Sequence, residues 1–374
     1  MPAHFFDFTS DTLAQWCAER DLPNFAARQI MEWIYQKKVV EPERMTNLAK
    51  RARELLAEHL MFDAGALVRH QSATDGTQKL LLDWSGAVLT SKVQDSNSLP
   101  IIGEPSGGDS NRQTECVMIP VDDDEHSRRT ACISSQIGCP VGCRFCASGL
   151  GGLDGNLTIG QIVEQAHRLS RLEGVDRISN VVFMGMGEPL ANFANVTGAI
   201  RTLNAPWGMG IGARKITIST VGLPAAIRKL VIFEIPVTLA LSLHAPNDEL
   251  RRQLIPWAEY ATIDEILDAC DEWFAKTGRE ITLEYLLLRN VNDRPEHADE
   301  LGRVAKSLRA NVNLIRYNEV KGLPYDRPTT EDVLTFQKVL REAGVNTHIR
   351  ASRGRDIAAA CGQLRHEHRD PQRA

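Results

Sequence analysis

Apolar residues recur every three or four positions near the start of the chain, and Lys and Arg occupy the opposite positions. Residues 25–36 and 45–60 show this spacing most clearly within the stretch from 10 to about 60. Such a period predicts amphipathic helices. From about 63 to 94 the apolar runs are short and bounded by turn residues, and 114–121 is a similar run, so these segments are predicted as β strands.

After about residue 128, strand-like and helix-like runs alternate. The strand-like runs are 129–135, 178–187, 214–221, 237–244, 280–288, 311–318 and 345–351. The helix-like runs include 158–174, 262–278, 297–308 and 330–344. This alternation predicts an α/β fold with parallel strands and right-handed crossovers. About six such units fit a partial or full (β/α) barrel or an open doubly wound sheet, and in each the site lies at the carboxyl ends of the strands.

These patterns divide the chain into three parts. Residues 1–62 are predicted as a small helical accessory domain, 63–127 as a β-rich connection, and 128–374 as the α/β region with a C-terminal cysteine segment. Within the connection, residues 95–113 are rich in Ser, Gly, Pro and Asp, and we expect them to form a flexible inserted loop.

The composition is that of a folded globular protein, with 374 residues, 43% hydrophobic and 24% charged, and a net charge of −5. The acidic balance argues against coating of nucleic acid by bulk charge but leaves local basic patches open. The most apolar run, 230–243, is interrupted by Glu234 and Pro236, and the first residues lack the features of a secretory signal. We therefore expect a cytoplasmic protein without a membrane segment, in a reducing compartment where the eight cysteines form no structural disulfides.

Three cysteines lie in one short loop after the first strand of the alternating region. Cys139, Cys143 and Cys146 form a C-x3-C-x2-C pattern. Three thiolates on such a loop can hold three irons of a four-iron cluster and leave the fourth iron open to a ligand. The alternative is a structural zinc site with Cys132 as the fourth ligand. Paired C-x2-C spacing is more usual for zinc, and Cys132 lies on the preceding strand, so the cluster is the favoured interpretation.

This loop resembles that of the radical S-adenosylmethionine (SAM) superfamily, whose three cysteines hold a [4Fe-4S] cluster that chelates SAM. The segments CISSQIGCPVGCRFCASGLGG, MGMGEPL, ITISTVG, LSLHAP, NLIRYN and DIAAACGQL resemble the RlmN/Cfr family of RNA adenine methyltransferases, over about residues 115–365. The resemblance implies a partial (β/α)6 radical SAM barrel with a helical N-terminal accessory domain and a short β extension. It also implies methylation of an RNA adenine, at C2 in the RlmN branch and at C8 in Cfr.

The resemblance also implies roles for individual residues. Cys361 receives a methyl group from one SAM, and a radical generated from a second SAM takes a hydrogen from the methylated Cys361. The S-methylene radical then adds to the adenine, and Glu115 accepts the adenine proton. Cys132 attacks the sulfur of Cys361, which releases the RNA and leaves a transient disulfide that thiol exchange reduces. The residues that match SAM contacts of the family are Gly187, Glu188, Ser219, Ser242, Leu243, His244 and Asn318.

Without the resemblance, the remaining cysteines have simpler interpretations. Cys361 lies in an Ala-rich turn, where a cysteine is usually a small buried hydrophobe. Cys17, Cys116 and Cys270 stand in no motif and are expected to pack in the core.

The resemblance further implies the partners. They are 23S rRNA in the peptidyl-transferase region, tRNA next to the anticodon, and an electron donor such as flavodoxin or ferredoxin, with the enzyme as a monomer. The segments LGGLDGNL and GLPYDRPT favour the RlmN branch. The alternatives are C8 methylation, a radical SAM enzyme for a protein or small molecule, and a zinc-stabilised RNA-binding module. The candidate RNA contacts are Arg128, Arg129, Arg214, Lys215, Arg251, Arg252, Arg350, Arg353 and Arg355.

Overall fold

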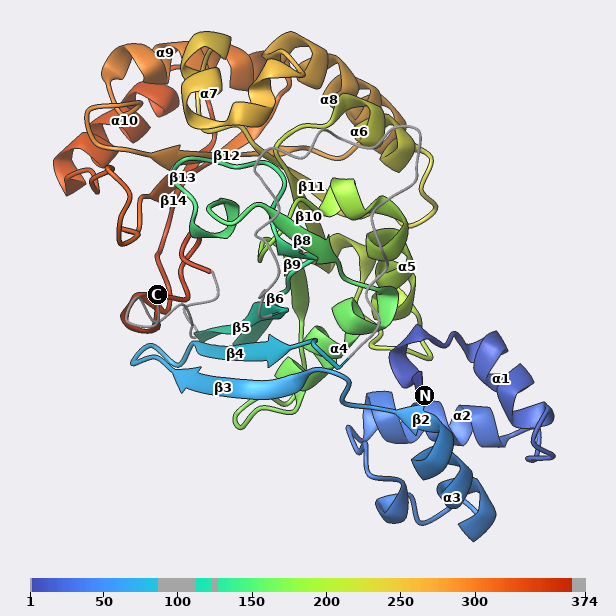
Figure 1. The fold of residues 1–374 in the computed structure, drawn as a ribbon. Helices are drawn as coiled ribbons and strands as arrows, with labels where there is room; N and C mark the ends of the chain where they lie inside the picture. Colours follow the sequence, from blue (N-terminus) through green and yellow to red (C-terminus); the bar gives the residue numbers. More distant parts are fainter. Residues whose placement is uncertain (1, 87–111, 123–126, 365–374) are drawn as a thin grey trace.

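The computed structural model describes residues 2–86, 112–122 and 127–364, and its main feature is one ten-stranded sheet (Figure 1). The strand order is β14-β13-β12-β11-β10-β9-β6-β5-β4-β3. In this order, the strands from β14 through β9 to β6 pair in parallel. The remaining strands, β5, β4 and β3, extend the sheet in antiparallel pairing. The bounds are β3 Ala66–Ser72, β4 Gln78–Asp83, β5 Gln113–Asp122, β6 Ser127–Cys132, β9 Asn180–Phe183, β10 Ile216–Thr220, β11 Thr238–Ser242, β12 Thr282–Leu287, β13 Asn311–Arg316 and β14 Thr347–Arg350.

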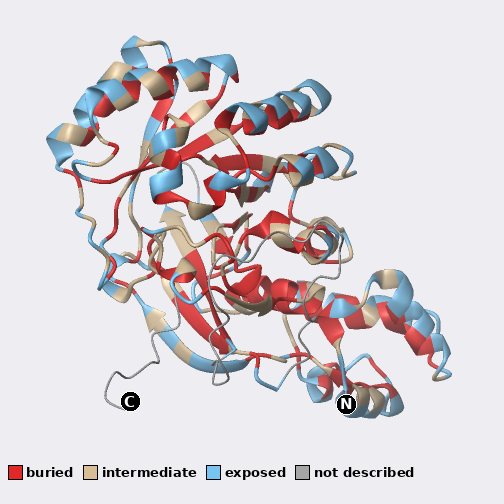
Figure 2. Cartoon of the chain, turned by 45° about the horizontal axis from the view of Figure 1, so that its top comes forward, coloured by how far each residue is buried: buried red, intermediate tan, exposed pale blue. Residues whose placement is uncertain are grey.

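Helices connect successive parallel strands and cover the outer face of the curved sheet (Figure 1). They are α4 Ile159–Ser170, α5 Phe193–Asn204, α6 Pro224–Val231, α7 Asp248–Leu254, α8 Ile263–Thr277, α9 Pro295–Ser307 and α10 Thr330–Glu342. Capping boxes open three of them, at Thr158, Thr262 and Thr329. The inner strands and the inward helix faces are buried, whereas the edge strand β3 and the outward helix faces are largely exposed (Figure 2).

The described strands form an open sheet with β14 and β3 at its edges. Six strand–helix units followed by the seventh parallel strand confirm the predicted partial (β/α)6 barrel, and β3–β5 are the predicted β extension. Of the loop predicted at 95–113, residues 95–111 lie outside the described residues, and Gln113 belongs to β5. Within the described ranges, no helix combines the length and apolar character needed to cross a membrane.

The N-terminal helices form a lobe at one end of the sheet (Figure 1). They are α1 Ser10–Ala18, α2 Ala26–Met31, which continues as a π-helix over Glu32–Gln36, and α3 Lys50–His59. Two short parallel strands close the lobe, β1 Ala3–His4 and β2 Leu60–Met61. This arrangement confirms the helices that the apolar spacing predicts.

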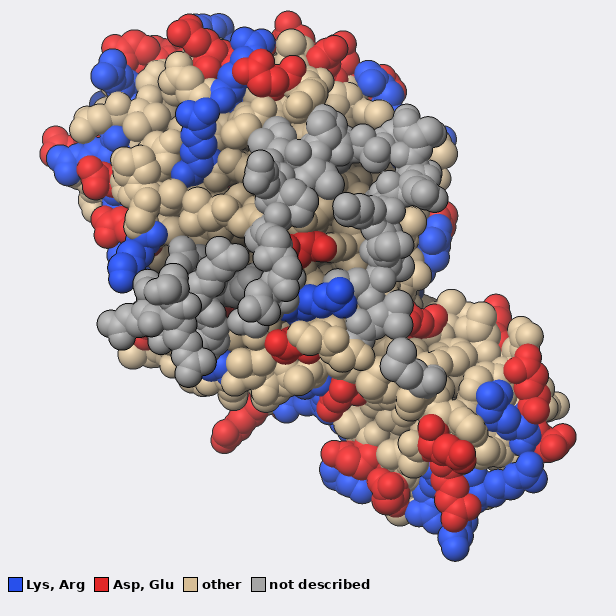
Figure 3. All heavy atoms as spheres, in the orientation of Figure 1, with Lys and Arg blue, Asp and Glu red and all other residues tan. Residues whose placement is uncertain are grey.

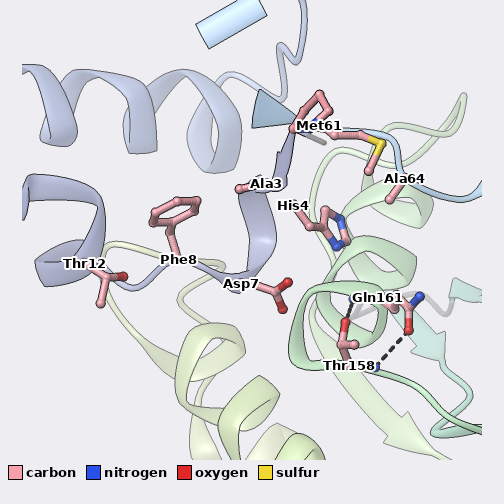
Figure 4. Close-up of a pocket in the computed structure, with 10 residues that line it drawn as sticks. Ala3, His4, Asp7, Phe8, Thr12, Met61, Ala64, Thr158 and Gln161 are labelled. Carbon is pink, nitrogen blue, oxygen red and sulfur yellow. Dashed lines mark hydrogen bonds between the residues drawn. The ribbon is translucent and has the colours of Figure 1, made fainter. Parts of the chain in front are cut away.

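Polar contacts fasten this lobe to α4. Asp7 Oδ1 accepts a hydrogen bond from the backbone N–H of Gly160 (2.7 Å), and His4 Nε2 lies 2.8 Å from Glu164 Oε2. At the other end of α4, Lys38 Nζ donates to the carbonyls of Ser170, Val175 and Asp176, as a cation does at a helix C-terminus. Beside the first contacts lies a cavity of about 470 Å³, and Figure 4 shows His4, Asp7 and Thr158 in its wall.

His167 of α4 gives the lobe interface a dependence on pH. Its ring packs against Phe6, and its Nε2 bonds to the Ile34 carbonyl at 2.8 Å. Burial lowers the pKa of His167 from 6.5 to about 3. The unfolded chain therefore binds the proton that the folded chain excludes, so this contribution to stability is present above pH 6.5 and is lost as the pH falls toward 3.

The substitution His167→Gln is expected to reduce the acid sensitivity of folding. The difference in unfolding free energy between pH 7 and pH 5 should shrink by about 2 kcal/mol, because each pKa unit corresponds to about 1.4 kcal/mol. Urea unfolding at the two pH values measures it, with the exposed His348→Gln as the control. An unchanged difference between the two pH values would contradict the assignment to His167.

Candidate active site

The cysteine loop lies between two short strands that the hydrophobic pattern did not predict. β7 Gln136–Gly138 pairs antiparallel with β8 Leu153–Asn156, and the loop between them carries Cys139, Cys143 and Cys146. All three cysteines line one cavity. Burial raises the pKa of each thiol, and for Cys143 the neighbouring thiols Cys146 and Cys139 raise it further. The hairpin therefore gathers three thiols at a place that favours a cationic partner for their charged form.

The carboxyl ends of three strands also contribute to the wall of this cavity. Gly187 and Glu188 follow β9, Ser219 lies on β10 and Ser242 ends β11, and all four line the cavity. The hydroxyls of Ser219 and Ser242 are 3.0 Å apart. Parallel strands bring these polar groups to one edge of the sheet, where ligands of α/β folds bind.

Glu188 is the most perturbed acid of this wall. Its carboxylate accepts hydrogen bonds from the backbone N–H groups of Leu190 (3.0 Å) and Val221 (2.9 Å). Burial nevertheless raises the pKa of Glu188 to about 7. A cationic ligand group beside it would restore its charge, and an ammonium group satisfies this requirement.

His244 lines the cavity in an unusual backbone conformation, with φ of 58°. Its Nδ1 accepts a hydrogen bond from the backbone N–H of Leu286 (3.1 Å), and its ring meets Phe145 edge-on at 5.1 Å. Burial, followed by the charge of Arg251, lowers the pKa of His244 to about 3, so the imidazole is neutral. Nδ1 of His244 is therefore used in a hydrogen bond within the fold, while the residue lines the cavity.

Two predicted SAM contacts do not line the cavity. Leu243 is fully buried, and its backbone N–H donates to the Glu284 carbonyl at 3.1 Å. Asn318 is also buried, and its Nδ2 donates to the Cys361 carbonyl at 3.4 Å. Asn318 thus holds the segment that carries Cys361, and the side chain of Leu243 packs in the core.

Cys361 reaches the cavity from the C-terminal segment, after β14. This segment joins the cysteine loop through two hydrogen bonds, Ala147 N–H to the Gly362 carbonyl (2.8 Å) and Ser148 Oγ to the Leu364 carbonyl (2.6 Å). Cys361 and Gly362 both line the cavity. The structure therefore brings the predicted methyl carrier beside the three predicted cluster ligands.

Cys132, at the end of β6, packs against the segment that carries Cys361, although the two cysteines are far apart in sequence. Cys132 packs with Ala359 and Leu364 in a small apolar cluster. Burial and, to a smaller extent, the charge of Cys361 raise the pKa of the Cys132 thiol to about 12, and the Arg350 guanidinium opposes both effects. The same guanidinium also interacts electrostatically with Cys361, so both cysteines have Arg350 as a neighbouring cation.

Glu115 does not line the cavity but lies beside the Cys361 segment. It is on β5 with 3% of its surface exposed. Its Oε1 is 2.7 Å from Lys79 Nζ, and Lys79 also donates to the Ala358 carbonyl at 3.1 Å. The carboxylate is therefore a buried and paired group rather than a solvated strand residue.

Comparisons with known proteins agree with this arrangement. The sequence profile described as the ribosomal RNA large subunit methyltransferase N-terminal domain matches residues 3–61, and that of the radical SAM superfamily matches residues 133–302. A protein of Rhodopirellula baltica named "Probable dual-specificity RNA methyltransferase RlmN" is 42% identical over 97% of this chain and 90% of its own. A Thermotoga neapolitana protein of the same name is 41% identical over 97% of each chain.

A solved structure shows the same fold. The crystal structure of a radical SAM methyltransferase from Sphaerobacter thermophilus is 38% identical to this chain, covers 97% of it and 99% of its own chain, and superposes with a TM-score of 0.87. This chain belongs to the RlmN family of radical SAM methyltransferases. The predicted family resemblance is confirmed.

The cofactors of the RlmN family are a [4Fe-4S] cluster and SAM, and the residues of this chain fit both. The three thiols of the loop line one cavity, and a four-iron cluster binds each thiolate to a different iron, which suits this set. Glu188, Ser219 and Ser242 are the residues of this wall that would offer acceptors to the ammonium and hydroxyl groups of SAM.

Sequence reasoning missed Glu284, a member of the same cavity wall. Its Oε1 accepts from Asn313 Nδ2 (3.0 Å), whereas its buried Oε2 has no hydrogen-bond partner among the described residues. Burial raises the pKa of Glu284, and the charge of Arg350 opposes this. A single carboxylate within the largely apolar residues 281–288 was the signal that could have identified it.

The structure corrects one of the predicted RNA contacts. Arg251 is fully buried and donates to the Val221 carbonyl, so it is not a surface contact for phosphate. Arg350 lines the cavity with its Nη1 3.5 Å from Met184 Sδ, and its contact with RNA stays a prediction. Arg129 pairs with Asp122 at 2.7 Å. Figure 3 shows Lys and Arg mixed with Asp and Glu on the N-terminal lobe rather than one basic face.

The three cysteines outside any motif pack in the core as predicted. Cys17, Cys116 and Cys270 are all buried, and burial raises the pKa of each thiol. They are therefore suitable control positions for the cysteines of the site.

Proposed function

We propose that this protein methylates C2 of an adenine in RNA, through a methylated Cys361. The proposed substrates are 23S rRNA in the peptidyl-transferase region and tRNA next to the anticodon. The observation that carries the proposal is the packing of the Cys361 segment against the cysteine loop, with Cys132 beside it. The names of the relatives, dual-specificity RNA methyltransferases, support RNA as the substrate class.

The geometry supports a division of labour among the chain's own residues. When bound, SAM supplies the methyl group and, reduced at the cluster, the radical that activates it. Cys361 carries the methyl group and, as an S-methylene radical, forms a carbon bond to the adenine; the adduct loses one electron, which the oxidised cluster would take back, and Glu115 accepts the proton that leaves the adenine carbon. The Cys132 thiolate then attacks the sulfur of Cys361, the carbon–sulfur bond breaks, and a Cys132–Cys361 disulfide forms. The released carbon keeps the electron pair of that bond and takes a proton, which completes the methyl group on the RNA. Cellular thiols reduce that disulfide for the next turnover.

The burial of the Cys132 thiol explains the role that we propose for the positive charge of Arg350. The Cys132 thiol, with a pKa near 12, is protonated at neutral pH, yet only a thiolate attacks sulfur efficiently. The Arg350 guanidinium opposes this rise in the pKa of Cys132 and so favours its thiolate. An electron donor such as flavodoxin or ferredoxin and a monomeric, cytoplasmic enzyme complete the proposal.

SAM with a fully deuterated methyl group tests the route through Cys361. Transfer through a methylene on Cys361 removes one methyl deuterium, so the RNA product should retain two, whereas direct transfer would retain three. Mass spectrometry of nucleosides from in vitro turnover measures the count. Comparison with 2-methyladenosine and 8-methyladenosine standards identifies the carbon, and an 8-methyl product would overturn the C2 assignment.

A further inference from the structure

The C-terminal segment that presents Cys361 has little regular structure of its own. Between β14 and Leu364, the last described residue, it contains one short 3-10 helix, Arg355–Ile357, among loops. The turn between β3 and β4 holds its first part, since Asp75 Oδ2 accepts from the backbone N–H of Gly354 (3.0 Å) and Asp356 Oδ2 accepts from that of Thr74 (2.9 Å). The β3–β4 hairpin therefore braces this segment on the side away from the cysteine loop.

Lys79 is the member of this hairpin that reaches the site. It lies on β4 with 2% of its surface exposed. Lys79 is opposite Val117 and Leu81 is opposite Glu115 in the β4–β5 ladder, so Lys79 and Glu115 are diagonal neighbours within reach of a long side chain. The ammonium joins the Glu115 carboxylate (2.7 Å) to the Ala358 carbonyl (3.1 Å).

Because Lys79 is buried, its ammonium group depends on these two contacts to replace its lost hydration. A lysine removed from water loses several kcal/mol of hydration unless acceptors replace it, and removal of one partner of a buried ion pair leaves the other uncompensated. The described contacts supply Lys79 with one carboxylate and one carbonyl. A packing role needs no such cation, and an aliphatic residue would fill the space at lower cost. The contacts therefore indicate that the placement of Glu115 relative to the Cys361 segment requires the cation.

We propose that Lys79 is a positioning residue that fixes the Glu115 carboxylate relative to the methyl-carrying Cys361. This inference rests on the proposed function. The cysteine loop holds the other side of the Cys361 segment by its bonds to Gly362 and Leu364, so methylation of Cys361 does not depend on Lys79. Transfer of the methyl group to RNA requires the Glu115 carboxylate and Cys361 to be held in a fixed position relative to each other. That step therefore depends on Lys79.

Separate assays of the two steps test the proposal. In Lys79→Met holoenzyme, Cys361 methylation, measured by peptide mass without RNA, should remain within about threefold of the wild-type level, and single-turnover transfer to RNA should fall about 100-fold, as for misplacement of a catalytic group. Lys79→Arg should recover about tenfold of that loss, because it restores the cation. The exposed Lys229→Met is the matched control and should leave both steps unchanged.

A double-mutant cycle with Glu115→Gln identifies the route of action. If Lys79 acts through Glu115, the double variant should transfer methyl groups no more slowly than Glu115→Gln alone. Multiplicative losses, or transfer by Lys79→Met at the wild-type rate, would overturn the inference. An equal loss in both steps, with lower iron content or thermal stability, would assign Lys79 a structural role and also overturn it. If Lys79→Met does not fold, Lys79→Gln replaces it in every comparison.

The outcomes for the wild-type enzyme separate the two proposals. A wild-type holoenzyme that methylates Cys361 but transfers nothing to RNA would overturn the proposed function and, with it, this inference. A wild-type enzyme that transfers normally while Lys79→Met equals it would overturn only the role of Lys79.

Discussion

Replacement of Cys361 by alanine is expected to lower methyl transfer to RNA by at least about a thousandfold, because it removes the sulfur on which the proposed transfer depends. The hydrogen bonds to the backbone carbonyls of this segment involve no thiol and should persist. They come from the Ala147 N–H to Gly362 and from the Asn318 side chain to Cys361 itself. The variant should therefore keep its cluster and its affinity for SAM. The assay is quantification of methyladenosine in RNA after in vitro turnover, together with iron content.

The control for Cys361→Ala is Cys270→Ala, at a fully buried cysteine of α8 outside the site. This variant should lose stability, by about 1 kcal/mol for the small apolar volume removed, but keep its rate of methyl transfer. Normal turnover by Cys361→Ala would contradict the methylcysteine route and favour a radical SAM enzyme of another type.

Replacement of Cys143 by alanine is expected to remove the cluster and, with it, at least about a thousandfold of the activity. The hairpin of β7 and β8 presents three thiols, and a four-iron cluster needs all three because each binds a different iron. Iron and sulfide analysis after anaerobic reconstitution should give about four of each per wild-type chain and a clear deficit in the variant.

The buried Cys17→Ala in the N-terminal lobe is the matched control and should reconstitute as the wild type does. A colourless wild-type protein that binds zinc without sulfide would overturn the cluster assignment. In that case the third interpretation, a zinc-stabilised RNA-binding module, would explain the cysteine loop.

Local sequence signals were reliable wherever hydrophobic periodicity decides the structure. All seven predicted strands after residue 128 occur, because each must be buried between the helices and the barrel interior. The signals failed for β7 and β8, whose Gly-rich residues carry no alternation and pair only because the cysteine loop folds back. The predicted contacts Leu243 and Asn318 match the motif, yet one side chain packs in the core and the other holds the Cys361 backbone.

The sequence by itself determined the strand–helix rhythm, the cysteine spacing and the family resemblance, because hydrophobic period and ligand spacing are local properties of the chain. Only the tertiary structure decided which distant groups meet. Cys132 and Cys361 lie at opposite ends of the parallel sheet order, and curvature of that sheet together with the docked C-terminal segment brings them together. The buried pair of Lys79 and Glu115 and the proximity of Arg350 to both cysteines likewise arise from packing across the sheet, since no local pattern encodes a long-range contact.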